Sequence, residues 1–94
     1  MNERRRERLA SALEEDLPSF FQEECELLPG ELVSILYVEI VESGAKANIF
    51  VSVFPDSARE RVARELKMRE NEATYFIRGR LGSKYSPVVR FHVR

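Results

Sequence analysis

His92 and Cys25 are the residues of this chain whose types could form a base and a nucleophile. A thiol becomes reactive when a neighbouring base takes its proton, but such a pair also needs a third group that orients the base and a cleft that holds the substrate. The spacing of the sequence indicates neither. We therefore expect no enzymatic activity and no small-molecule substrate, with Cys25 as a small apolar residue at a helix end and His92 on the open face of a strand.

Glu14, Glu15 and Asp16 offer carboxylates that could ligate a metal ion. Consecutive residues point in different directions around a helix, so these side chains do not converge on one point. Cys25 is the only cysteine, which excludes a disulfide framework and a multi-cysteine metal site and fits a reducing compartment. We expect no metal ion, no cofactor and a cytoplasmic location.

The charges of the chain are segregated, although the formal net charge is only −1. Between Glu14 and Glu42 there are nine acidic residues and no basic one, whereas residues 59–94 hold ten basic residues against four acidic ones. Lys and Arg neutralise phosphates and release counterions, so this asymmetry favours one surface that binds a polyanion such as RNA and another that repels it. The alternative is a solvated charged surface without a partner.

The candidate RNA-binding residues lie mainly in the last predicted helix and strand, and we expect their side chains to form a single basic surface. The N-terminal arginines either extend this surface or lie free in solvent. The candidates are Arg78, Arg80, Lys84, Arg90, Arg94, Arg69, Lys67, Arg4, Arg5 and Arg6. Tyr75 and Tyr85 could stack on unpaired bases, although packing is the favoured role for both.

Residues 32–54 predict a β-hairpin, because two runs rich in β-branched and aromatic residues flank a polar turn at Ser43-Gly44. Residues of a strand alternate between its two faces, so each run has an inward apolar set. These sets are Leu36, Val38 and Ile40 in the first run and Ala47, Ile49, Val51 and Val53 in the second. A hairpin alone is marginal in water, so helices must cover this face.

Helices are predicted on both sides of the hairpin. Apolar residues recur at helical spacing over about residues 4–24, with Pro18 as a kink or a break. Ser57 and Glu60 form a capping-box pattern that starts a second helix. The pattern pauses at Asn71-Glu72 before a third helix that ends near Gly82.

The last strand turns Val89, Phe91 and Val93 inward and Arg90, His92 and Arg94 outward. The order helix, strand, strand, helix, helix, strand then predicts one α+β two-layer domain over residues 1–94, with helices packed on one face of a three-stranded sheet. No run of 18 or more apolar residues and no apolar signal region are present, so we expect neither a membrane span nor secretion.

Three stretches of the chain together resemble ribosome-binding factor A, a bacterial family with a type II KH-like fold. The stretches are AKANIFVSVFPDS, ATYFIRGRLGSKYSPVVRFHV and RLASALEEDL. The similarity covers nearly the whole chain, from residue 8 to residue 93, and it rests on the order and spacing of these stretches together, since no single motif in them is highly specific.

The resemblance implies an assembly factor of the small (30S) ribosomal subunit. Members of this family bind the free subunit late in its assembly, contact 16S ribosomal RNA and support the processing of its ends, particularly in the cold, without being enzymes. The family also has an Ala-x-Gly kink between its last two helices, and the matching positions are Ala73, Thr74 and Tyr75, with tyrosine in place of glycine. We expect a monomer. The alternative is a KH-like module that binds other RNA, or a protein, away from the ribosome.

Overall fold

The computed structural model describes residues 1–82 and 86–94. Its elements are α1 (Glu3–Glu24), β1 (Leu32–Val41), β2 (Lys46–Phe54), α2 (Arg59–Met68), α3 (Glu70–Leu81) and β3 (Val88–Val93). Short 3₁₀ turns at Glu42–Gly44 and Asp56–Ala58 precede β2 and α2. The α-β-β-α-α-β order and the α+β class that the sequence predicts are therefore confirmed.

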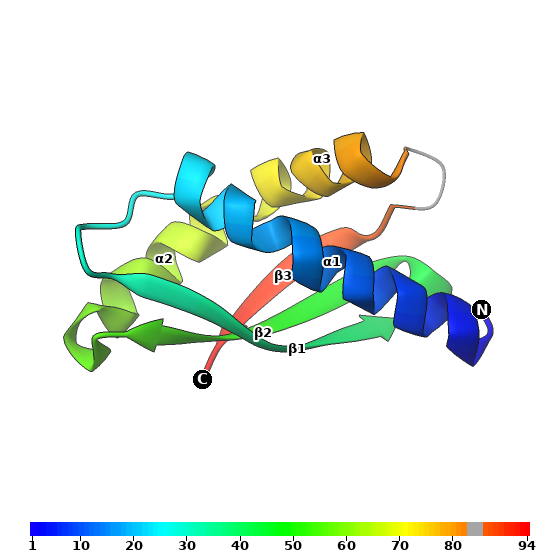
Figure 1. Ribbon diagram of the computed structural model, residues 1–94, viewed down its shortest axis with the longest axis horizontal. Helices are drawn as coiled ribbons and strands as arrows, with labels where there is room; N and C mark the ends of the chain where they lie inside the picture. Colours follow the sequence, from blue (N-terminus) through cyan, green and yellow to red (C-terminus); the bar gives the residue numbers. More distant parts are fainter. Residues whose placement is uncertain (83–85) are drawn as a thin grey trace.

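The sheet has the strand order β1-β2-β3, with β1 and β2 antiparallel and β2 and β3 parallel. Parallel pairing needs a crossover connection, which α2 and α3 supply. The helices lie on one face of the sheet and leave the other face open (Figure 1). None of the described helices is both long and apolar enough to cross a lipid bilayer.

The hydrophobic core lies between the helices and the covered face of the sheet. Full burial of a large apolar side chain contributes about 1.5–3 kcal/mol, and most residues of the predicted inward sets are buried or partly buried, with Leu36 as the exception. The fully buried side chains include Leu13, Leu17, Phe20, Ile49, Val51, Val62, Leu66, Ile77 and Val89.

Helix α1 continues through Pro18 without a break. The proline ring removes the hydrogen bond to the carbonyl of Glu14, but Leu17, Phe20 and Phe21 on either side of it are buried and hold both halves of the helix against the core. At the start of α1, the side chain of Asn2 accepts a hydrogen bond from the backbone N–H of Arg5 at 2.9 Å.

A β-bulge in β1 corrects the predicted inward set of that strand. The pairing register changes between Ile35 and Tyr37, so Leu36 is an extra residue, and its side chain is 52% exposed rather than buried. The bulge lets Ile35 and Val38 both face the helices, because an extra residue shifts the alternation by one. Periodicity alone does not reveal such an insertion.

The starts of α2 and α3 also differ from the prediction. No side chain caps α2, which follows the 3₁₀ turn, so the capping box of Ser57 and Glu60 does not form. The interruption between α2 and α3 falls on Arg69, before the Asn71-Glu72 pause. Ala73, Thr74 and Tyr75 lie inside the continuous helix α3 and form no kink.

The outer edge of β3 is covered in part by α3. The N–H of Val89 donates to the hydroxyl of Thr74 at 2.9 Å, and the N–H of Phe91 donates to the carboxylate of Glu70 at 2.9 Å. Edge strands expose unpaired backbone groups, and these two side chains accept hydrogen bonds from two of the N–H groups of β3. Thr74 and Glu70 therefore fix α3 along the first half of the edge.

Candidate functional site

A groove of about 480 Å³ opens where the cover on the edge of β3 ends. The helical interruption at Arg69 separates the line of α2 from that of α3, so α3 follows β3 only as far as Phe91, and α2 faces the rest of the strand. We call this space the α2–β3 groove. Its lining consists of Phe50, Ala63, Lys67, Phe91, His92, Val93 and Arg94.

The α2–β3 groove carries positive charge beside aromatic rings. Lys67 and Arg94 are exposed, and neither forms an ion pair with another described residue. The guanidinium of Arg94 lies 4.8 Å from the centroid of the Phe50 ring, and the Nε2 of His92 is 2.9 Å from the Oδ1 of Asn48. Unpaired cations attract phosphates, and exposed rings offer surfaces on which unpaired bases stack.

Three other predicted cations are bound to acidic side chains of the same molecule. Arg69 bonds to Glu65 at 2.9 Å and to Glu72 at 3.0 Å, and these hydrogen bonds raise its pKa. Arg80 lies 3.7 Å from Asp16, and Arg90 lies 3.9 Å from Glu70. Their first role is therefore to join elements of the fold.

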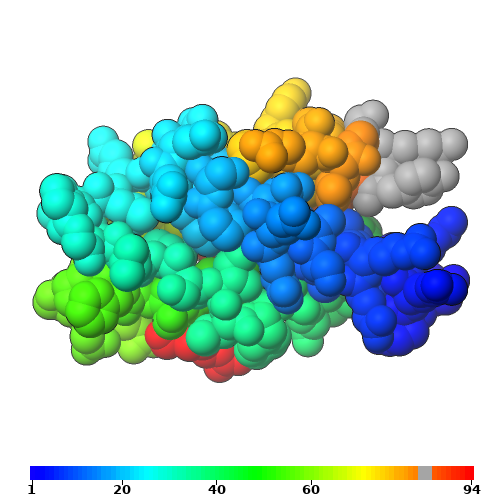
Figure 2. Space-filling model, in the orientation of Figure 1, coloured from blue at the N-terminus to red at the C-terminus, as the bar shows by residue number. Residues whose placement is uncertain are grey.

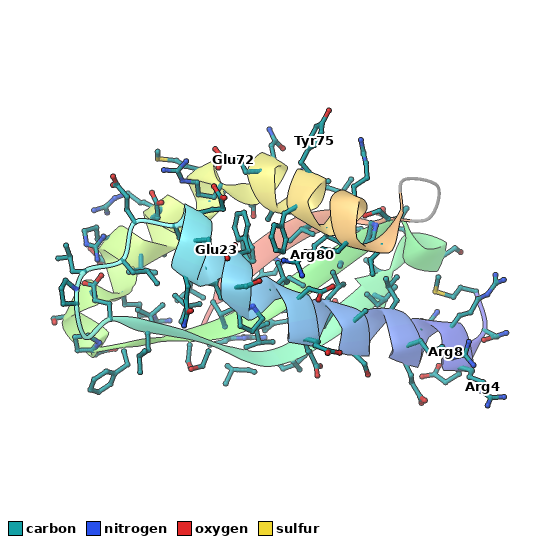
Figure 3. The ribbon with its side chains drawn as sticks, turned by 45° about the horizontal axis from the view of Figure 1, so that its top comes forward. Arg4, Arg8, Glu23, Glu72, Tyr75 and Arg80 are labelled. Atoms are coloured by element: carbon teal, nitrogen blue, oxygen red, sulfur yellow. The ribbon has the colours of Figure 1, made fainter. Side chains whose placement is uncertain are left out.

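The remaining candidates lie on other parts of the surface. On α3, the exposed guanidinium of Arg78 is 5.5 Å from the centroid of the Tyr75 ring, which points away from the domain (Figure 3). Tyr75 is 73% exposed, so the packing role favoured for it is wrong. Lys84 and Tyr85 lie outside the described residues.

The N-terminal arginines lie at one end of the molecule. Figure 1 places the N-terminus at one end of the long axis, well away from the C-terminus that follows β3. Arg4 and Arg5 are exposed, and Arg6 forms an ion pair with Glu3 at 3.4 Å. These side chains cannot extend the α2–β3 groove.

The expected single basic surface is therefore not formed. α1 and α3 lie side by side (Figure 2), and Asp16 of α1 pairs with Arg80 near the end of α3. The candidate cations divide between the α2–β3 groove, the outer side of α3 and the start of α1. The sequence does not reveal this division, because it depends on the directions in which the helices and β3 point these side chains.

The sequence reasoning did not select Phe50, which lines the α2–β3 groove, or Tyr37, whose ring centroid lies 4.4 Å from that of Phe50. Phe50 alternates with inward residues of β2, so the pattern placed an aromatic ring on the polar face of a strand. The outward ring could have identified Phe50 as a candidate binding residue, because an aromatic side chain on an open sheet face does not pack in the core.

Cys25 and His92 do not form a catalytic pair in this fold. Cys25 is buried at the end of α1 and does not line the groove that contains His92. Burial raises the pKa of the Cys25 thiol to about 12, and the nearby carboxylate of Glu65 contributes to the shift. Within residues 1–82 and 86–94, no group of three or more His, Cys, Asp or Glu side chains is arranged to hold a metal ion.

Neither a protein-family model nor a curated protein sequence matches this chain.

Proposed function

We propose that this protein binds RNA in the α2–β3 groove and acts as an assembly factor of the small ribosomal subunit. The observation that carries the proposal is the position of Lys67 and Arg94, two cations without acidic partners among the described residues, beside the rings of His92 and Phe50. Such cations bind backbone phosphates, and such rings stack on the bases of single-stranded RNA.

The ribosomal part of the proposal has separate support. The three stretches that resemble ribosome-binding factor A lie in α1, in β2 with the turn after it, and in α3 with β3, and the observed order of elements is the one that the resemblance implies. The proposed binding partner is immature 16S ribosomal RNA in the free 30S subunit, in the cytoplasm.

The mechanism would be binding without bond-making. A monomer would hold one conformation of the immature RNA while its ends are processed, particularly in the cold, and would then leave. No cofactor or small-molecule substrate takes part in this scheme. The KH-like classification belongs to the same proposal.

A second candidate function is a KH-like module for other RNA or for a protein partner. The division of the arginines among three surfaces favours it, because a factor that grips a large RNA benefits from one continuous basic face. The two functions differ in partner, so a ribosome gradient separates them.

Binding measurements test the RNA-binding part. Affinity for a 16S fragment should fall steeply with salt, and Lys67→Glu should weaken binding about fivefold or more and lower the salt slope by about one. Arg4→Glu, at the far end of α1, is the matched charge reversal and should have a smaller effect. Equal losses in both variants would contradict the groove assignment.

The double variant Arg78→Glu, Arg80→Glu tests the alternative surface on α3. If the groove binds the RNA, this variant should retain more affinity than Lys67→Glu. If the ranking is reversed, α3 is the interface.

Sedimentation of the tagged protein through a sucrose gradient of cell lysate tests the ribosomal part. Co-migration with free small subunits, and not with translating ribosomes, is the expected result. A position only at the top of the gradient would count against the assembly role while leaving RNA binding to be judged from the affinity measurements.

A further inference from the structure

The open face of the sheet carries a row of three aromatic rings, of which Phe50 and His92 also line the α2–β3 groove. Tyr37 on β1, Phe50 on β2 and His92 on β3 are partners in register, so their side chains project together from the uncovered face. The ring centroids of Tyr37 and Phe50 are 4.4 Å apart with an interplanar angle of 16°, and those of Phe50 and His92 are 4.9 Å apart with an angle of 22°. We call this row the aromatic column.

The β-bulge at Leu36 is what completes the aromatic column. Ile35 pairs with Val51, so a regular strand would place Leu36 opposite Phe50. The extra residue brings Tyr37 to that position instead. A local irregularity of the strand therefore selects an aromatic side chain over an aliphatic one, and bulges often redirect side chains in this way.

The two ends of the aromatic column are open to a ligand. Phe50 lies on the middle strand and stacks with two rings, whereas Tyr37 and His92 each stack with one ring of the column. Within the described part of the chain, no other aromatic ring or guanidinium stacks on their outer faces. Tyr37 is 45% exposed, and His92 is exposed and lines the α2–β3 groove.

Arg94 is held above the aromatic column by two contacts. Its guanidinium lies over the Phe50 ring, and one of its N–H groups donates to the hydroxyl of Tyr37 at 3.1 Å. A guanidinium has five N–H donors, so these contacts leave others for an anion. Arg94 is exposed and has no acidic partner among the described residues.

We propose that the aromatic column is a binding site for unpaired bases of single-stranded RNA, with one base on the outer face of Tyr37, another on the outer face of His92, and a phosphate of the backbone that runs between these two bases on Arg94. The site extends the α2–β3 groove across the open sheet face. It rests on the proposed RNA binding and adds a preference for unpaired over double-stranded RNA.

Charge and ring arrangement favour single-stranded RNA over a protein occupant. The guanidinium of Arg94 forms no ion pair with a described residue, so an anion is its complement. Flat faces at both ends suit bases, which stack on aromatic rings whatever their identity. A protein partner or a second copy of this chain would bind by burying exposed apolar side chains such as Leu36 and Phe54. That kind of contact does not use the free faces of Tyr37 and His92.

Fluorescence of a single-stranded ten-nucleotide RNA that contains 2-aminopurine tests this site, because stacking quenches that base. The wild-type protein should quench it on binding. Tyr37→Leu removes the π face and should weaken binding about fivefold or more and reduce the quenching. Tyr37→Phe keeps the ring but lacks the hydroxyl that accepts a hydrogen bond from Arg94, so it should retain the quenching and lose less affinity than Tyr37→Leu. A duplex of the same length should respond weakly to either change.

Two further variants keep the test decisive. Leu36→Ala alters the neighbouring exposed side chain and should bind like the wild type, and thermal unfolding of each variant verifies that it is folded. If Tyr37→Leu is unfolded, Arg94→Gln takes its place and should weaken binding several-fold. Unchanged affinity and quenching in folded Tyr37→Leu or Arg94→Gln would overturn the proposal.

The outcomes for the two proposals are separable. Loss of binding in Lys67→Glu together with wild-type behaviour of Tyr37→Leu would overturn the aromatic-column site and leave the RNA-binding function intact. Absence of any RNA binding by the wild type at low salt would overturn both. Dimerisation of the wild type that Tyr37→Leu abolishes, seen by sedimentation velocity, would assign the open face to a second copy instead.

Discussion

The carboxylate of Glu70 accepts a hydrogen bond from the backbone N–H of Phe91 at 2.9 Å, which joins the first turn of α3 to the outer edge of β3. Glu70 is only 8% exposed, so the N–H of Phe91 would lose its partner in a dry environment if the carboxylate were removed. The pair marks the point where α3 leaves the strand and the α2–β3 groove begins.

Glu70→Ala should therefore lower the free energy of unfolding by about 1–3 kcal/mol, the cost of a buried donor without an acceptor. Urea unfolding followed by circular dichroism measures this change. Glu70→Gln retains an acceptor oxygen and should cost less. Equal losses in the two variants would show that the bond to Phe91 is not what stabilises this edge.

Leu36 and Ile40 should respond very differently to truncation, although both belong to the inward set that periodicity predicts. Ile40 is 5% exposed, so Ile40→Ala should cost about 2–5 kcal/mol through lost burial and a cavity. Leu36 lies outward in the bulge, and Leu36→Ala should change stability by about 0.5 kcal/mol or less. Thermal and urea unfolding measure the stability of both variants. A large loss of stability in Leu36→Ala would contradict the outward position of Leu36 in the bulge.

Stability should fall in acid partly because of Glu65. Burial opposes ionisation of this carboxyl, but hydrogen bonds from the backbone N–H of Glu26 at 2.7 Å and from Arg69 at 2.9 Å outweigh it and lower the pKa below 4.5. The folded state therefore holds the proton less tightly than the unfolded state. The contribution is fully present above pH 4.5 and disappears as the pH falls through the folded-state pKa.

Glu65→Gln should be less stable than the wild type at neutral pH, and the difference should shrink steadily in acid. Urea unfolding at a series of pH values between 2 and 7 gives both curves. Parallel curves over that range would show that the titration of Glu65 is not coupled to folding.

Cys25 should resist thiol reagents as long as the chain is folded. Burial raises its pKa from 9.0 to about 12, which lowers the thiolate fraction at pH 8 by about a thousandfold, and the side chain is also shielded from the reagent. Reaction with a disulfide reagent should be at least about a hundredfold slower in buffer than in concentrated urea. Similar rates in the two solvents would mean that the end of α1 opens readily.

Much of the fold follows from the sequence, because it depends on local patterns. The period of Leu13, Leu17 and Phe20 specified the buried side of α1, and alternation specified the inward residues of β2 and β3. Gly82 ends α3 as predicted, with a φ of +91° that favours glycine. Each of these features is decided within a few residues of the chain.

The amino-acid sequence also determined which residues are candidates for the proposed RNA contact, since it fixes how many cations and rings the chain contains. Only the tertiary structure decided which of them act together. Asp16 and Glu70 engage arginines far away in the sequence, the interruption at Arg69 opens the groove, and the bulge at Leu36 aligns Tyr37 with Phe50 and His92. Such pairings depend on how separate elements pack, and no local pattern of residues encodes the distances between them.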